Sequence, residues 1–162
     1  MLRTAQLYKE ELNKKYIATW YNPKYMYYND IGCREIQIGD NNFERHDFVC
    51  VNDNDEVTGY FSYHINWTTK SIDNFGIISF IDNNIIFIKD VINHVIHLLN
   101  DIKINRIEFW AFVDNPAFDG YEKLVKKFGG KQVGTLHQLE LLSDGKLHDV
   151  GIFEILNTKK NR

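Results

Sequence analysis

Residues 75–113 read FGIISFIDNNIIFIKDVINHVIHLLNDIKINRIEFWAFV, and this stretch decides the fold. Residues 75–81 and 106–113 are apolar on both alternating faces, which is typical of strands covered on both sides of a sheet. Between them, apolar residues recur at helical spacing over residues 85–102, with Asn83 or Asn84 available as N-cap. The pattern predicts a strand, a helix and a second strand parallel to the first.

The sequence before this stretch predicts a helix and two antiparallel strands. Residues 2–15 carry apolar positions at helical spacing among charges, which favours an amphipathic helix on a sheet. Residues 48–52 and 57–67 are rich in β-forming side chains, and the polar residues 53–56 between them indicate a hairpin turn.

The sequence after it predicts a second helix and a terminal hairpin. Residues 117–128 indicate a helix that ends at Gly129-Gly130, where a left-handed residue is easily accommodated. Two apolar runs, 132–142 and 147–156, flank an Asp-Gly turn. We therefore expect one domain over 1–162, with a core at 48–156 and a helical, aromatic part at 1–47.

Composition excludes several classes of protein. The net charge is -3 and the pI about 6.1, so there is no basic field for nucleic acid, and no apolar run is long enough to span a membrane. Cys33 and Cys50 form no CxxC pair, and the first residues do not resemble a signal peptide. We expect reduced thiols in a cytoplasmic protein.

The order of elements, together with DNPAFDGYEKL at 114–124, FGG at 128–130 and DGKLHD at 144–149, resembles the Gcn5-related N-acetyltransferase (GNAT) superfamily over roughly residues 48–156. The resemblance implies a mixed α/β (α+β) fold. Its twisted sheet is mostly antiparallel, with flanking helices and a central parallel strand pair that splays apart at its C-terminal ends. It also implies acetyl-CoA as co-substrate, and direct attack by a primary amine without a covalent enzyme intermediate.

The resemblance assigns roles to particular residues. Tyr121, four residues after the small Ala117, is the predicted catalytic proton donor to the leaving thiolate. Asn115 resembles the asparagine that binds the pantetheine arm, but its spacing to Tyr121 is one residue short, so Asp114 is the alternative. The arm is expected to pair with the backbone around 78–81. The predicted cofactor-binding residues are Ile78, Ser79, Phe80, Ile81, Asn83, Asn84, Ile85, Lys89, Asn115 and Tyr121.

The segment IDNNIIFIKDV, residues 81–91, departs from the superfamily because it lacks the glycine-rich loop that cradles pyrophosphate. The N-terminus of the following helix still offers N–H groups to an anion, and Asn83, Asn84 and Lys89 add donors. Lys126 and Lys127 belong to a run of charges that indicates a solvated helix face, and the alternative is that they approach the adenosine 3′-phosphate of the cofactor.

The general base and the acceptor stay open at this level. Asp73, Glu108 and His64 are candidate bases, and a water chain is another. The Tyr25–Tyr28 cluster either packs under the first helix or shapes the acceptor site. We expect a small-molecule or peptide amine, such as a polyamine or an aminoglycoside.

Two further expectations concern metals and turnover. His94 and His97 stand at helical spacing without a third ligand, so no metal is expected. The chain is a possible homodimer. The alternative function is a CoA-binding or regulatory module that has lost turnover with its glycine loop.

Overall fold

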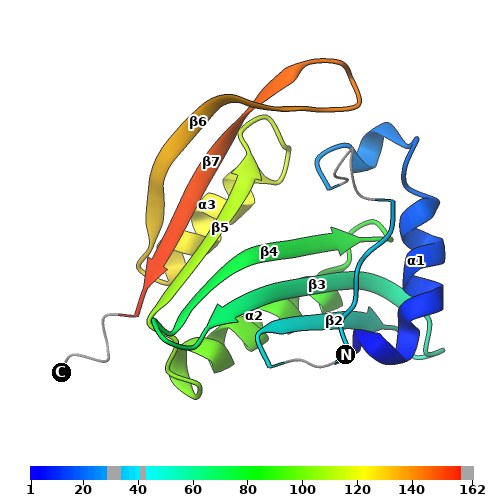
Figure 1. Cartoon of the computed structure of the whole chain (residues 1–162), viewed down its shortest axis with the longest axis horizontal. Coiled ribbons are helices and arrows are strands. Elements are labelled where there is room, and N and C mark those ends of the chain that lie inside the picture. The colour runs from blue at the N-terminus through cyan, green and yellow to red at the C-terminus, as the bar shows by residue number, and fades with distance from the viewer. Residues whose placement is uncertain (29–33, 41–42, 158–162) are drawn as a thin grey trace.

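A seven-stranded sheet forms the centre of the molecule, in the strand order β1-β2-β3-β4-β5-β7-β6 (Figure 1). The structure is a computed structural model that describes residues 1–28, 34–40 and 43–157. Among the strands of these residues, β4 and β5 are the one parallel pair and every other neighbouring pair is antiparallel. The mixed, mostly antiparallel sheet predicted from the sequence is therefore confirmed.

The elements follow the predicted order from the first antiparallel strands onward. The strands are β1 (Leu2–Thr4), β2 (Arg45–Val51), β3 (Val57–Asn66), β4 (Ser71–Ser79), β5 (Arg106–Phe112), β6 (Lys131–Leu141) and β7 (Leu147–Leu156). The α-helices are α1 (Lys9–Ile17), α2 (Ile85–Asn100) and α3 (Phe118–Lys127), and η1 (Ala5–Tyr8) and η2 (Pro23–Tyr25) are short 3-10 helices.

The N-terminal prediction of a helix over residues 2–15 is wrong for its first part. Leu2, Arg3 and Thr4 form strand β1, which pairs with β2 and extends the sheet by one strand. Backbone pairing with an open sheet edge overrides the local helical pattern there. The predicted apolar face still packs on the sheet, because Ala5 and Leu12 are fully buried.

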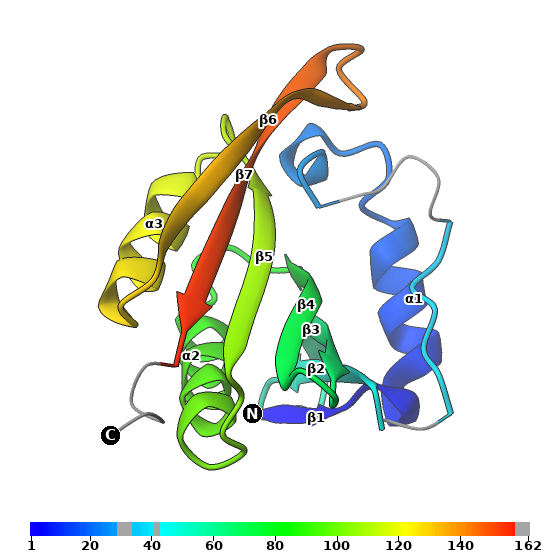
Figure 2. The ribbon, with the colours of Figure 1, turned by 60° about the vertical axis from the view of Figure 1, so that its left-hand side comes forward.

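The helices form two layers around the sheet. α2 and α3 cover one face, whereas α1 lies on the other (Figure 2). One buried cluster packs under α2 and includes Phe61, Val95 and Phe153, and a second includes Leu12 of α1, Val49 and Ile78. Among the described residues, no helix is long and apolar enough to cross a membrane. Cys50 is buried with a free thiol, and Cys33 lies outside the described residues.

Strands β4 and β5 separate after a short zipped segment. Their parallel pairing joins Ser71 to Arg106 and Ile72 to Ile107. Just beyond it, β4 carries one residue more than β3 between paired positions, and Asn74 has a φ of 51°. Such a bulge bends a strand and increases its twist. The predicted parting of the two strands toward their C-terminal ends is therefore confirmed, although β4 begins at Ser71 rather than at residue 75.

The ends of α2 and α3 follow local rules. The Asn84 side chain accepts a hydrogen bond from the Phe87 N–H at 3.2 Å and caps α2, so Asn84, not Asn83, is the N-cap. Gly129 after α3 has a φ of 76°, a left-handed conformation that a residue with a Cβ rarely adopts.

Candidate active site

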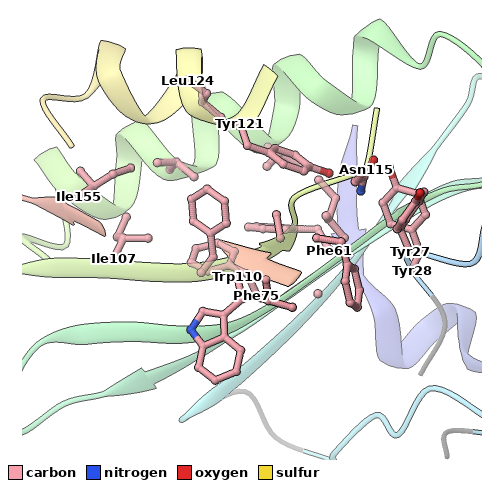
Figure 3. A pocket seen from close by; sticks show the side chains of 18 of the residues that line it. Tyr27, Tyr28, Phe61, Phe75, Ile107, Trp110, Asn115, Tyr121, Leu124 and Ile155 are labelled. Atoms are coloured by element: carbon pink, nitrogen blue, oxygen red, sulfur yellow. The ribbon is translucent and has the colours of Figure 1, made fainter. Parts of the chain in front are cut away.

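A cavity of about 320 Å³ lies where β4 and β5 separate, under α2 and α3 (Figure 3). Its wall is largely apolar and aromatic, as is usual for sites that bind small organic molecules. Tyr27, Tyr28 and Asn115 lie together at one end, and the Tyr121 side chain points toward them (Figure 3). The lining includes Tyr27, Tyr28, Gly76, Ile77, Trp110, Asn115, Tyr121 and Glu140.

The cavity reaches between the two strands rather than lying on one face of the sheet. Its lining includes consecutive residues of β4, namely 75–77, and consecutive residues of β5, namely 109–112. Because successive side chains of a strand point to opposite faces, the lining draws on both faces of the sheet. A ligand in this gap can therefore be approached from both sides.

Tyr121 projects from α3 into the wall of the cavity (Figure 3). Its ring meets that of Phe109 edge to face, with the centroids 6.0 Å apart. Burial raises the pKa of Tyr121 well above its usual range, and a hydrogen bond with the Tyr28 hydroxyl adds to the shift. The hydroxyl therefore stays protonated at any physiological pH and is available as a hydrogen-bond donor.

Asn115 and Asp114, the two alternatives after β5, take different places. Asn115 is buried and lines the cavity, and its Oδ1 accepts a hydrogen bond from the Ala117 N–H at 2.9 Å. Its Nδ2 group is the donor that it can offer to a ligand. Asp114 is about half exposed and bonds to His148 at 2.7 Å. The structure thus brings Asn115, not Asp114, together with Tyr121 around the cavity.

The predicted cofactor residues of β4 lie at the strand's end, outside the cavity lining. Ile78 is buried against the α1 layer, and the Phe80 N–H donates to the Thr58 carbonyl of β3 at 3.0 Å. Backbone groups alternate in direction along a strand, so those of Ile77 and Ser79 face the edge that β5 has left. Ile81 follows the strand and is 48% exposed.

The N-terminus of α2 is partly occupied by the protein itself. The Ile85 N–H donates to the Asn83 carbonyl at 2.7 Å, and Asn84 caps the helix. The Asn84 Nδ2 also donates to the Thr58 carbonyl at 3.0 Å, so this side chain holds the fold together. Lys89 is exposed on the first turns of α2. Lys24 of η2, which sequence reasoning missed, forms an ion pair with Asp82, which lies in the loop before α2.

The candidate bases of the sequence lie away from the cavity. His64 pairs with Asp73 at 3.2 Å on neighbouring strands, and Glu108 forms an ion pair with Arg106. None of these is among the lining residues. Within the described part of the chain, Glu140 of β6 is the one carboxylate that lines the cavity. Sequence reasoning missed it because no local pattern distinguishes it on a strand whose side chains are mostly exposed.

The histidine pair on α2 has a structural explanation. His94 lies within hydrogen-bond distance of the Tyr63 hydroxyl, at 2.8 Å, and burial lowers the pKa of His94 to about 4. The neutral ring therefore accepts from Tyr63 within the core. His97 instead pairs with Asp101 at 2.7 Å. No three candidate ligand side chains of the described residues come together in a way that could hold a metal ion.

The tyrosines of residues 25–28 differ in their surroundings: one packs near the first helix, and others line the cavity. Tyr25 is buried in the cluster around α1, whereas Tyr27 and Tyr28 line the cavity. Trp110 also contributes to the wall and is 55% exposed. These aromatic residues come from segments far apart in the sequence, and no spacing rule links them.

No protein-family model matches the chain, and no curated protein sequence matches it. Solved structures do. Spermidine N-acetyltransferase SpeG from Vibrio cholerae, in complex with manganese ions, is similar at 22% identity and a TM-score of 0.59 over 74% of this chain and 69% of the other. The dodecameric structure of the same enzyme in an intermediate state is similar at 21% identity and a TM-score of 0.59, over 75% of this chain and 70% of the other.

A chimera of the same enzyme with hSSAT gives 21% identity and a TM-score of 0.58, over 75% of this chain and 73% of the other. These likenesses agree with the sheet order, the one parallel pair and the parting of β4 from β5. The chain therefore has the fold of the Gcn5-related N-acetyltransferases.

Proposed function

We propose that this protein is an N-acetyltransferase that moves the acetyl group of acetyl-CoA onto a primary amine by direct attack. The observation that carries the proposal is the cavity between the parted ends of β4 and β5, with Tyr121 in its wall. A thioester in this gap has the free edge of β4 on one side and an aromatic hydroxyl on another. Both are hydrogen-bond donors of the kind that acyl transfer requires.

The proposed chemistry assigns one step to each group. The neutral amine attacks the thioester carbon, the backbone N–H of Ile77 or Ser79 stabilises the oxyanion, and the C–S bond breaks after the C–N bond has formed. The attacking nitrogen passes its proton to Glu140 or to water, and the CoA thiolate leaves and takes up a proton from water. Because the pKa of Tyr121 is raised far above that of a thiol, Tyr121 donates a hydrogen bond to the developing thiolate.

The acceptor in this proposal is a cationic amine, approaching from the side of the cavity where Glu140 lies. The carboxylate of Glu140 attracts an ammonium group and is placed to accept its proton, and the exposed face of Trp110 adds a cation–π contact. The similar solved structures are spermidine N-acetyltransferases, which supports a polyamine among the amines to be tried.

The experiment that tests the function is amine-dependent release of CoA thiol from acetyl-CoA. A panel of polyamines, aminoglycosides and peptides with free amino groups covers the acceptor classes. The proposal expects thiol release above the rate of hydrolysis with at least one cationic amine, together with a mass increase of one acetyl group on that amine. Stabilisation of the protein by CoA with no release across the panel would contradict it.

A second candidate, a CoA-binding or regulatory module without turnover, is favoured by one observation. The first turn of α2 uses the Ile85 and Phe87 N–H groups internally and exposes Ile85 and Ile86, at 73% and 66%, where a diphosphate would lie. Acetyl-CoA and CoA would then bind without amine-dependent release.

A homodimer and a cytoplasmic location are further parts of the proposal. Light scattering after size exclusion tests whether the protein is a dimer.

A further inference from the structure

Four side chains from three distant segments meet beside the polar end of the cavity. His148, at the start of β7, is 5% exposed at its side chain, and its Nδ1 lies 2.7 Å from Asp114 Oδ2. Its Nε2 lies 3.0 Å from Asp144 Oδ1, in the turn between β6 and β7. The Tyr27 ring meets the His148 ring edge to face, with the centroids 6.2 Å apart, and burial together with the nearby Asp114 raises the pKa of the Tyr27 hydroxyl. We call these four residues the His148 cluster.

The geometry fixes the protonation state of His148. An ionised carboxylate only accepts hydrogen bonds, and a neutral imidazole has one N–H to donate. Both ring nitrogens face carboxylate oxygens, at 2.7 and 3.0 Å, so both contacts are hydrogen bonds only if both nitrogens carry protons. The folded protein therefore favours the imidazolium.

The His148 cluster is connected to the candidate catalytic residue through two consecutive tyrosines. The Tyr27 ring contacts the rings of His148 and Phe112, at centroid distances of 6.2 and 5.9 Å, and Tyr28 is the next residue. Both tyrosines line the cavity. A change that releases Tyr27 therefore also moves Tyr28, which lines the same cavity as Tyr121.

We propose that His148, as an imidazolium, is a positioning residue that holds Tyr27 and Tyr28 in the wall of the cavity, which they share with Tyr121. The proposal rests on the proposed function for its kinetic consequence, and on the contacts alone for its structural one. When His148 loses a proton, one of its two carboxylate bonds is lost. The β6–β7 turn or the Asp114 contact is then released, and the acyl-transfer site loosens.

Other charged groups around His148 set the pH range. The hydrogen bond with Asp144, opposed by burial and supported by Asp114, raises the pKa of His148 above its ordinary value. Asp149 also interacts with His148, and Lys146 with Asp144. Because the folded pKa is higher than the unfolded one, the stabilisation is complete below the unfolded pKa near 6.5 and is lost as the pH rises through the folded pKa.

A titration of the unmodified protein tests the structural part without any assay of turnover. Histidine and tyrosine rings labelled with ¹³C are followed by NMR from pH 5 to 10. We expect one histidine to titrate above the ordinary value, and the ring signals of Tyr27 and Tyr28 to shift with the same midpoint. The Asp144→Asn variant, which keeps an acceptor for the Lys146 N–H, should lower that midpoint. A His148 midpoint at or below 6.5, or tyrosine signals that ignore it, would overturn the proposal.

Kinetics test the positioning role. The hairpin supplies a matched control, because His137 pairs with Asp149 at 2.8 Å but is 77% exposed and bonds to one carboxylate. We compare kcat/KM of wild type with that of His148→Gln and His137→Gln across pH 6 to 10, so that ionisation of the amine cancels in each ratio. The wild-type to His148→Gln ratio should be roughly tenfold at pH 6, as expected for one charge-assisted hydrogen bond, and approach one at high pH.

The His137→Gln ratio should stay near one throughout. A wild-type to His148→Gln ratio that does not change with pH would refute the positioning role. A wild-type protein that releases no CoA would instead refute the proposed function, and the NMR titration would still decide the structural claim about the His148 cluster.

Discussion

The hydroxyl of Tyr121 is a single group whose removal should slow acetyl transfer without altering the site around it. The Tyr121→Phe variant keeps the ring, and with it the edge-to-face contact with Phe109 and the packing of α3. It loses the hydrogen bond to the developing thiolate. A charge-assisted hydrogen bond contributes about 1.5–3 kcal/mol, which corresponds to a fall in kcat of about 10- to 160-fold.

The assay is the initial rate of CoA thiol release at saturating amine, beside the dissociation constant for CoA by calorimetry. CoA affinity should stay close to that of wild type, because the hydroxyl acts on the leaving group rather than on the bound thioester. Tyr21→Phe is the control, since Tyr21 is 94% exposed and outside the cavity. An unchanged kcat for Tyr121→Phe would refute the role of this hydroxyl.

Three other substitutions test separate parts of the account. Lys89→Ala should raise the dissociation constant of CoA several-fold without making binding more dependent on salt, because it removes one exposed cation near the N-terminus of α2. An unaltered dissociation constant, measured by calorimetry, would exclude Lys89 from the phosphate site. Glu140→Gln should raise KM for a cationic amine while the dissociation constant of CoA stays constant. Equal increases in KM and in the CoA dissociation constant would contradict a role of Glu140 in binding the amine. Asn84→Ala should lower the unfolding free energy by roughly 1–3 kcal/mol in urea, as it removes the α2 cap and the bond to Thr58, and a loss under 0.5 kcal/mol would contradict this.

Local chemistry made much of the fold predictable. The two apolar runs and the amphipathic segment between them gave β4, α2 and β5, and the left-handed glycines marked turns that the structure confirms, with Gly129 after α3 and Gly145 in the terminal hairpin. The parting of β4 from β5 was expected from the resemblance to a superfamily. No residue spacing predicts it.

The parts that were missed depend on contacts between distant residues. β1 exists because Leu2 pairs with Cys50, a backbone contact that no pattern within residues 2–15 reveals. His148 and Asp114 are 34 positions apart, and the Tyr27 ring contacts His148 from the N-terminal segment. Glu140 likewise acquires its place only when β6 closes the end of the sheet.

A crystal structure of the protein with CoA would test the central claim most directly. The expected result is the pantetheine arm in the gap between β4 and β5, bonded to the backbone of Ile77 and Ser79, with its sulfur within hydrogen-bond distance of the Tyr121 hydroxyl. Electron density for CoA elsewhere on the surface, or β4 and β5 paired along their whole length with the gap closed, would contradict it.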